Sequence, residues 1–525
     1  MKTCCLLYAA AGAVLLGGCL PKPVSTLVDQ TSFTLREKEP ADEMFRSIDE
    51  LSREEAVRIA LKNNPNYLEA GQSITAARMR LYQALGGYSP VISAATAVGD
   101  QLYDSSGAPE LESGNAFYSY TMVQASFLIF DGLAREFQVE AARHSLAGEE
   151  ALQENARRLL TQAVSNAFDD ILLAAAQRKI ADSDFEFQSK MLEDSRLREK
   201  AGTANRSGVL NFAGKRNRAA ARRVTASYQY EVGRYVLAVL LGYPDGTLPE
   251  ELKFTQEKPD EAAPLPVGAA LDAALANRPD LKNFREQLRV SEYQLYSRYS
   301  AFSPRISAFA NYSYSSNSTR NSGNNPNGFA NFYVEGNSFN YGAMAELTIF
   351  NGLIRYNRLR ESRAQLAIMQ YKGAEAWLRI VADVRNAHAN VQHNRELAAL
   401  NRENRDIMRE QRDLVAKSYL AGEAEITRLN EAQNNFVAAE EEYVQSLVNL
   451  SKARAQLAAA GHPLLGDGKY GKLDKRFDRN YQALYSYKLT FTFTTDAGSL
   501  AYLNGKSFRV EKVDFAEQYF PNVKI

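Results

Sequence analysis

The sequence predicts a mainly α-helical chain with a membrane β-barrel portion, built from a duplicated unit of helix, strand, strand, long helix and helix. Two long stretches of the chain match each other without a gap, which indicates duplication. Each copy contains two segments in which apolar and polar residues alternate, the period of a β-strand. The first copy also contains a proline-free stretch from Leu133 to Lys200, with apolar residues at helical spacing.

The start of the chain has the features of a bacterial lipoprotein signal peptide. Lys2 gives a positive start, and an apolar run follows from Leu6 to Leu16. The run is shorter than the roughly 20 residues that span a bilayer, but it fits a secretory signal. The sequence LGGC at 16–19 resembles the lipobox, in which the cysteine is lipidated. We therefore assign residues 1–18 to a lipoprotein signal peptide; an ordinary signal peptide without lipidation is the alternative.

Lipidation at Cys19 would anchor the chain through acyl chains such as palmitate, at roughly 0.8 kcal/mol for each buried CH₂ group. The residue after this cysteine is Leu20 and not an aspartate. By resemblance to lipoprotein sorting in enteric bacteria, this favours the outer membrane. Residues 19–50 then form an N-terminal lipid-anchored extended segment. The other cysteines, Cys4 and Cys5, lie in the signal peptide, so we expect no disulfide after Cys19.

The duplication appears at a fixed offset of 214 between residues 51–98 and 265–312. Matches later in the chain, such as residues 130–133 with 350–353, need an offset only a few residues larger. We assign residues 51–249 to the first repeat and residues 265–465 to the second. Residues 250–264 form the linker between them, because this stretch is rich in proline and charge. The identical pairs include Ala56/Ala270, Ala60/Ala274, Pro65/Pro279, Tyr82/Tyr296, Pro90/Pro304 and Ile92/Ile306.

Each repeat contains two predicted strands, at about 90–103 and 118–130 in the first and at about 304–316 and 332–350 in the second. One apolar face indicates strands that lie against lipid or a core. Four strands do not close a membrane barrel, which needs about eight, and lipid tolerates no open sheet edge. Chains would therefore share one barrel, of eight strands from a dimer or twelve from a trimer. A small soluble sheet is the alternative.

Helices complete each repeat, predicted in the first copy over 51–86, 133–200 and 207–241. A helix of about 68 residues is about 100 Å long, and one of about 35 residues is about 50 Å long. Two short helices end to end therefore match one long helix, so the chain supplies four helical columns of equal length. Pro65 marks a break or a new helical start within the first of them.

Paired motifs recur at matching places in the two copies: ALKNNP at 60–65 and ALANRP at 274–279, SP at 89–90 and 303–304, FDG at 130–132 and FNG at 350–352, AG at 201–202 and 421–422, and LNEAQ at 429–433. Each is weak alone, but together they cover about 51–463 in duplicate. The sequence is thereby similar to the TolC-type outer-membrane efflux protein family. The resemblance implies a homotrimer whose twelve-stranded β-barrel continues into an α-helical periplasmic tunnel with a closed tip. It also implies docking to a periplasmic adaptor (membrane fusion) protein and to an inner-membrane transporter, proton-driven or ABC-type.

The same resemblance implies two sets of functional residues at the helix-turn-helix tips. The adaptor-contact residues are Ala201, Gly202, Thr203, Ala421, Gly422 and Glu423. Glycine permits close backbone approach there, although a simple helix C-cap is the alternative role. The periplasmic aperture residues are Tyr419, Glu425, Arg428 and Glu431.

The aperture departs from the family pattern at two positions. Arg428 stands where family members carry an acidic ring, and three such arginines would repel one another unless Glu425 or Glu431 pairs with them. The aspartate that latches the tip in some members falls at Gly208, so that latch is not expected.

We expect no enzyme, cofactor or metal site. Among four histidines, His388 and His393 are five residues apart, which misses the shared helix face that a metal pair needs. His388 shares its register with Val384 and Val391, which predicts a packed side chain. No phosphate loop or nucleophile elbow occurs in the sequence. The 62 basic and 62 acidic residues cancel, which excludes the broad basic surface of a nucleic-acid partner.

Residues 466–525 have no counterpart in the first copy. Alternation around Phe491 and Phe493 and the pair Asn504-Gly505 predict a C-terminal β-rich appendage, with no role assigned.

The predicted function is an outer-membrane channel of a tripartite efflux or type I secretion system. It would be a passive duct for small molecules or proteins, lipid-anchored in the cell outer membrane and extending into the periplasm. The alternative is a structural lipoprotein, a helical spacer or adhesin without a transport lumen.

Overall fold

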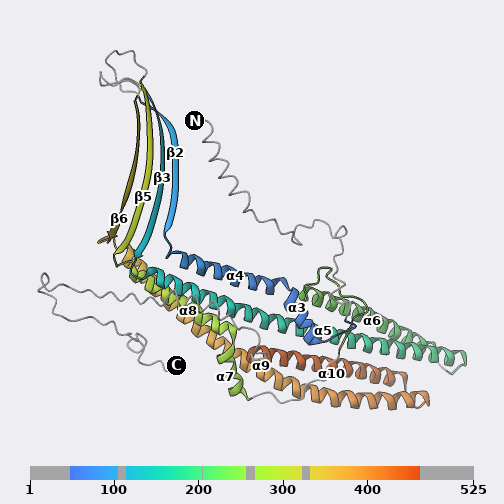
Figure 1. The fold of residues 1–525 in the computed structure, drawn as a ribbon. Helices are drawn as coiled ribbons and strands as arrows, with labels where there is room; N and C mark the ends of the chain where they lie inside the picture. Colours follow the sequence, from blue (N-terminus) through green and yellow to red (C-terminus); the bar gives the residue numbers. More distant parts are fainter. Residues whose placement is uncertain (1–47, 104–113, 204, 256–265, 322–331, 462–525) are drawn as a thin grey trace. The chain divides into compact units, whose positions relative to one another are not determined.

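The computed structural model describes residues 48–103, 114–203, 205–255, 266–321 and 332–461. Six elements follow one another in the same order twice (Figure 1). In the first half these are α3 (Arg53–Asn63), α4 (Pro65–Gly86), β2 (Val91–Tyr103), β3 (Gly114–Phe130), α5 (Ala134–Lys200) and α6 (Arg206–Leu240). In the second half they are α7 (Val267–Asn277), α8 (Pro279–Ser300), β5 (Arg305–Asn321), β6 (Phe332–Glu346), α9 (Ile354–Leu420) and α10 (Ile426–Gly461).

The helix predicted over 51–86 is two helices, because Pro65 begins a new one. The side chain of Asn64 caps α4 by accepting from the backbone N–H of Asn66 at 3.0 Å, and Pro65 occupies the first helical position, where no N–H is needed. The same break separates α7 from α8 at Pro279. Ser52 caps α3 by accepting from the N–H of Glu55 at 3.2 Å. We call the breaks at Asn64-Pro65 and Arg278-Pro279 the first and second joint.

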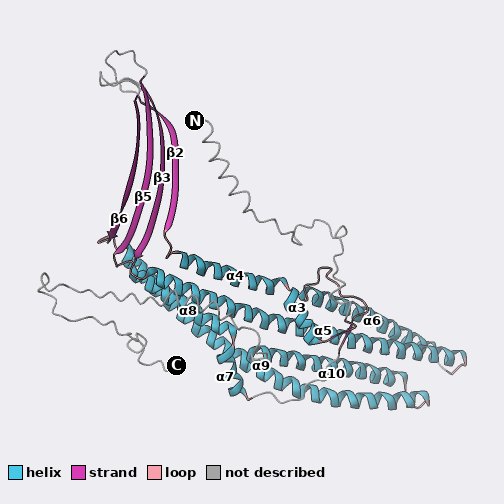
Figure 2. Cartoon of the chain, viewed as in Figure 1, coloured by secondary structure: helices cyan, strands magenta, loops and turns pink. Residues whose placement is uncertain are grey.

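The four long strands form one antiparallel sheet in the order β2-β3-β5-β6 (Figure 2). Within the described residues this sheet is open, since the outer edges of β2 and β6 pair with no further strand. The two repeats meet where β3 pairs with β5, so strands from both halves of the chain form one sheet. A second, two-stranded parallel pairing joins β1 (Glu50–Leu51) to β4 (Lys253–Phe254).

The prediction of a strand as far as residue 350 was wrong at its end. β6 stops at Glu346, which pairs with Arg305, the first residue of β5. Pro304 precedes that residue and has no N–H to donate, so the ladder has no partner for residues 347–350. In the other direction, β3 begins at Gly114 and β5 continues to Asn321, beyond the predicted bounds, because the two strands pair with each other there.

A tight turn leads from the second strand of each half, β3 or β6, into a 67-residue helix. Gly132 and Leu133 have φ values of 72° and 69°, and Gly352 and Leu353 have values of 65° and 63°. A Cβ on Gly132 would lie 2.6 Å from the Cβ of Ser303, so this position requires glycine. The carboxylate of Asp131 accepts from the N–H of Ala134 at 3.1 Å and thereby caps α5. The FDG motif is therefore a strand-to-helix connection.

The long helices α5 and α9 take part in both halves of the helical packing (Figure 1). On the sheet side of the joints, α4 packs on α5, α5 on α8 and α8 on α9. On the other side, α6 packs on α5, α5 on α10 and α10 on α9. None of the described helices is long and apolar enough to cross a membrane.

Candidate functional site

The two helix-turn-helix tips have the same backbone geometry. After α5, Gly202 has a φ of 76°, and the N–H of Thr203 donates to the carbonyl of Arg198 at 2.9 Å. After α9, Gly422 has a φ of 82°, and the N–H of Glu423 donates to the carbonyl of Ser418 at 2.9 Å. Both turns are Schellman caps, which favour glycine because a Cβ disfavours the left-handed region.

The tip residues named from the sequence are exposed on these turns. Ala201, Gly202, Thr203, Ala421, Gly422 and Glu423 all present their side chains or backbone to solvent in the single chain. A Cβ added to either glycine would meet no atom of the described residues within 4 Å. The positive φ therefore accounts for both glycines within the chain, and the surface around them is open to a partner.

A shared apolar cluster holds the two tips together. It contains Met191, Leu192, Val209, Phe212, Val415, Leu429 and Ala432, drawn from α5, α6, α9 and α10. Tyr419 packs its ring edge-on against Phe212, with 6.2 Å between ring centroids, and the guanidinium of Arg198 lies 5.2 Å from the centre of the Tyr419 ring. Arg198 also donates to the carbonyl of Leu420 at 3.3 Å. Tyr419 thus contributes to the packing between the two tips.

The three charged aperture residues are exposed at the start of α10. The carboxylate of Glu425 accepts from the hydroxyl of Thr427 at 3.2 Å, and its carbonyl accepts from the N–H of Arg428 at 3.1 Å. No ion pair joins Arg428 to Glu425 or Glu431 among the described residues. The structure therefore places these exposed side chains at and just before the first two turns of α10, with no ion pair between them among the described residues.

Gly208 lies against the second tip. A Cβ there would be 3.7 Å from Cδ1 of Ile426 and 3.8 Å from Oγ of Ser195, which is ordinary contact distance. The position that carries a latch aspartate in some family members is here part of an apolar contact between α6 and the start of α10.

A buried polar contact ties α10 to α5 above the tips. The Asp184 carboxylate accepts from Nε2 of Gln433 at 3.0 Å and from Nε2 of Gln188 at 3.3 Å. Arg222 of α6 approaches the same carboxylate at 3.6 Å. All three hydrogen-bonded side chains are buried, so they hold α10 at a fixed position on α5.

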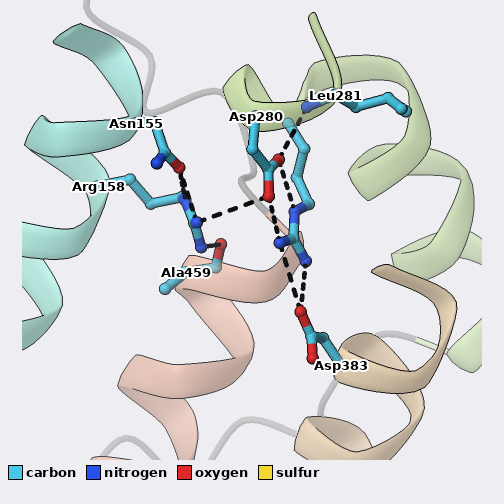
Figure 3. A network of polar contacts seen from close by, with 7 residues as sticks. Asn155, Arg158, Asp280, Leu281, Asp383 and Ala459 are labelled. Carbon is cyan, nitrogen blue, oxygen red and sulfur yellow. Dashed lines mark hydrogen bonds and ion pairs between the residues drawn. The ribbon is translucent and has the colours of Figure 1, made fainter. Parts of the chain in front are cut away.

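The second joint carries a charge network that the sequence interpretation missed (Figure 3). Arg278, only 5% exposed, donates to the carboxylate of Asp280 at 2.6 Å and to that of Asp383 at 3.3 Å. Arg158 of α5 donates to the carbonyl of Ala459 at 3.1 Å and lies 3.9 Å from Asp280. Four helices therefore meet at this network. The signal was the triplet Arg278-Pro279-Asp280, which stands where the first copy has Asn64-Pro65-Asn66.

The charges of this network shift one another's ionisation. Burial opposes the charged form of Asp280, but hydrogen bonds from Arg278 and the charges of Arg278 and Arg158 outweigh it, so the pKa of Asp280 lies below its usual 3.8. Burial also opposes the charge on Arg278, and its bonds to Asp280 and Asp383 outweigh that effect and raise its pKa. Both residues are ionised at neutral pH.

The start of α3, the helix before the first joint, contacts a different and more deeply buried carboxylate. Asp169 of α5 is 1% exposed and accepts from Nη2 of Arg53 at 2.7 Å. Arg53 also donates to the hydroxyl of Ser451 at 3.2 Å. Burial raises the pKa of Asp169 above its usual value despite the opposing effect of Arg53. The pKa values of Asp169 and Asp280 are thus shifted in opposite directions.

The histidines lie as the periodicity predicts. His388 is buried beside the line of Val384 and Val391, and His393 is exposed, so the two do not share a face. Within the described ranges no group of histidine, cysteine and acidic residues is placed to hold a metal ion. The predictions for Cys19, for residues 1–47 and for the C-terminal appendage lie outside the described residues.

Comparison with known proteins finds one matching family model and several similar structures. Residues 270–461 match the family model described as outer membrane efflux protein. The chain is similar to a membrane protein from Pseudomonas aeruginosa, with a TM-score of 0.67 and 18% identity over 84% of this chain and 99% of that one. It is also similar to the CmeC outer membrane channel of Campylobacter jejuni, with a TM-score of 0.67 and 13% identity over 84% and 93% of the two chains.

The MtrE outer membrane channel of Neisseria gonorrhoeae is a further similar structure, with a TM-score of 0.59 and 17% identity over 84% and 97% of the two chains. No curated protein sequence matches the chain. The resemblance to the outer-membrane efflux protein family is confirmed. CmeC and MtrE are both outer membrane channels.

Proposed function

Because residues 270–461 carry an outer membrane efflux protein domain, we propose that this protein is the outer-membrane channel of a tripartite export system. It is a passive duct that receives cargo from an inner-membrane transporter and a periplasmic adaptor and releases it outside the cell. The observation that supports this most is a sheet whose two edges are unpaired within the described residues, and whose strands β3 and β6 each lead through a tight turn into a 67-residue helix.

The open sheet supports closure between copies of the chain. Its order, β2-β3-β5-β6, places one strand of each repeat at an edge, and these edge strands run in opposite directions. Edge β6 of one copy can therefore pair antiparallel with edge β2 of the next. Lipid tolerates no open edge, and three copies of four strands make a twelve-stranded barrel. The proposed assembly is a homotrimer.

The lipobox supports the proposed location. Acylation at Cys19 would tether each copy to the outer membrane beside the barrel, and the helices would then extend into the periplasm. Exported cargo is either small molecules, driven by a proton-coupled transporter, or proteins, driven by an ABC transporter. The lipid anchor favours the first.

The exposed turns at Gly202 and Gly422 are the proposed adaptor contacts, because a Cβ added at either glycine would meet no atom of the described residues within 4 Å. Arg428 and Glu431 are the proposed lining of the aperture. If the double variant Arg428→Ala plus Glu431→Ala leaves single-channel conductance and antibiotic leakage unchanged, the aperture assignment is wrong.

Native mass spectrometry of the protein extracted from outer membranes in mild detergent tests the proposal. We expect a trimer with three acyl modifications that forms channels in a planar bilayer. A monomer that keeps its strands and passes no current would instead support the helical spacer or adhesin.

A further inference from the structure

Two aromatic rings lie over glycines of neighbouring strands in the four-stranded sheet. Tyr118 of β3 is the register partner of Gly99 on β2, where a Cβ would lie 2.7 Å from the hydroxyl oxygen of Tyr118. Phe309 of β5 is the register partner of Gly342 on β6, where a Cβ would lie 3.2 Å from Cζ of Phe309. Each ring therefore occupies the space above its partner strand that a side chain on that strand would fill.

Both rings lie on the same face of the sheet. Phe309 pairs with Ser126 on β3, and Ser126 is eight residues from Tyr118, an even number. At about 3.3 Å per residue, the two rings are about 26 Å apart along the strands. Tyr118 is 42% exposed and Phe309 is half-buried, so each ring keeps surface that a solute can contact.

In the barrel of the proposed function, on which this assignment rests, one face of the sheet adjoins lipid and the other adjoins the lumen. On the face with the rings, every second residue of β5 from 307 to 317 is serine or asparagine, except Phe309. The opposite face of β5 carries Ile306, Ala308, Ala310, Tyr312 and Tyr314. Because the apolar face of a membrane barrel lies against lipid, the two rings face the lumen.

The wall around the rings carries no charge. At residues 307–317 of β5, and at their partners on the same face of β2, β3 and β6, no charged residue occurs in the described sheet. The first charged residues on this face are Arg305 and Glu346, which are register partners of opposite sign at the start of β5. A solute that passes the rings therefore meets hydroxyl and amide groups, small side chains and aromatic surface.

We propose that Phe309 and Tyr118 of each copy are binding subsites for planar aromatic molecules without net charge, which stack on the rings as they pass through the lumen. Contact between aromatic rings raises a binding constant by about threefold to tenfold beyond the effect of the buried area. The surrounding hydroxyl and amide groups exchange hydrogen bonds with polar substituents of such a molecule. A wall without fixed charge offers a charged solute no attractive partner.

Current block in planar bilayers tests the subsites. Naphthol and its saturated counterpart decalol are both uncharged and similar in size, and only naphthol is aromatic. We expect naphthol to block the current through the wild-type trimer about threefold to tenfold longer than decalol does. Phe309→Leu and Tyr118→Leu should each shorten the naphthol blocks and leave the decalol blocks unchanged. The matched control is Phe339→Leu, which removes a 64% exposed ring from the opposite face of the sheet and should change neither.

Substitution of the glycines tests the position of the ring against the wall. Gly342→Val should lower the single-channel conductance, because the Phe309 ring must leave the wall and enter the lumen. Gly336→Val is the matched control on the same strand and the same face. A Cβ on Gly336 would meet no atom of the described residues within 4 Å, so valine there displaces no ring and should lower the conductance less.

The outcomes separate the subsites from the proposed function. A wild-type trimer that conducts, but is blocked equally long by naphthol and decalol, would overturn the subsites and leave the proposed function standing. Equal effects of Phe309→Leu and Phe339→Leu on the naphthol blocks would also overturn them. A monomer that passes no current would overturn both the subsites and the proposed function.

Discussion

The two joints break their helices at equivalent prolines, yet they are stabilised by different interactions. At the first joint, Leu51, Phe168, Ile171, Leu237 and Leu241 are fully buried in one apolar cluster. The neutral side chain of Asn64 caps the helix and donates to the carbonyl of Leu240 at 2.9 Å.

The second joint has a smaller cluster, in which alanine is the commonest residue, and the arginine before its proline, Arg278, belongs to a charge network. The proline therefore causes the break in both copies, whereas the side chains that stabilise the break differ between them. Beside the larger cluster, burial outweighs the charge of Arg53 and raises the pKa of Asp169. Beside the smaller one, the hydrogen bonds and charges of the arginines outweigh burial and lower the pKa of Asp280.

The largest effect should come from truncating the apolar joint. We expect Phe168→Ala to destabilise the helical domain by about 3–5 kcal/mol, because the side chain is fully buried and leaves a cavity. Val384→Ala at the second joint removes two methyl groups and should cost about 2 kcal/mol. Thermal unfolding followed by far-ultraviolet circular dichroism measures both. Equal losses would show that the two cores do not differ as described.

Removing the carboxylate of the charge network should have the next largest effect. Asp280→Asn should cost about 2–3 kcal/mol, since the buried Arg278 loses its closest partner. Asp272→Asn, on the exposed side of the preceding helix, is the control and should change little. A loss no greater than that of the control would mean that Asp383 alone satisfies Arg278.

Substitution of the two tip glycines should reduce stability by equal amounts, in contrast to substitutions at the two joints. Gly202→Ala and Gly422→Ala should each cost about 1 kcal/mol, because alanine is strained at a positive φ. Gly214→Ala, within α6 and with open space around its Cβ, should instead stabilise slightly. Comparison of unfolding temperatures measures the three, and a marked difference between Gly202 and Gly422 would show that the two caps are not equivalent.

The pH dependence of stability should be the smallest effect and the most specific, because it has opposite signs for Asp169 and Asp280. The pKa of Asp280 is lowered, so its contribution is complete above pH 3.8 and is lost as the pH falls through its folded pKa. The pKa of Asp169 is raised, so its contribution is present below pH 3.8 and is lost as the pH rises through its folded pKa.

Stability measured between pH 3 and 7 therefore separates the two carboxylates. The loss caused by Asp280→Asn should shrink towards low pH, whereas Asp169→Asn should change neutral-pH stability by less than about 1 kcal/mol and reduce the decline with rising pH. Parallel profiles for the two variants would contradict the opposite shifts.

Local signals in the sequence predicted most of the elements. Pro65, the FDG motif and Gly202 each act within a few residues, through a missing N–H, a side-chain cap or a positive φ, so their positions could be assigned without knowing the rest of the fold. The burial of His388 followed from helical register alone.

Other features depend on residues far apart in the chain. The end of β6 at Glu346 is set by the start of β5, and neither limit is visible in the alternation pattern, which continues to Ile349. Arg158 reaches Asp280 across more than a hundred residues, and its own surroundings in the sequence give no sign of that contact.

The sequence by itself determined the long helices, the breaks between the short ones, the tip turns and the presence of the strands, though not where they end, because each is encoded by spacing and by residues with restricted backbones. The tertiary structure alone decided that β3 pairs with β5, that the order near the tips is α6, α5, α10, α9, and which charges meet at the second joint. The physical reason is that pairing and packing depend on which surfaces fit in space, and a residue's local spacing carries no information about its distant partner.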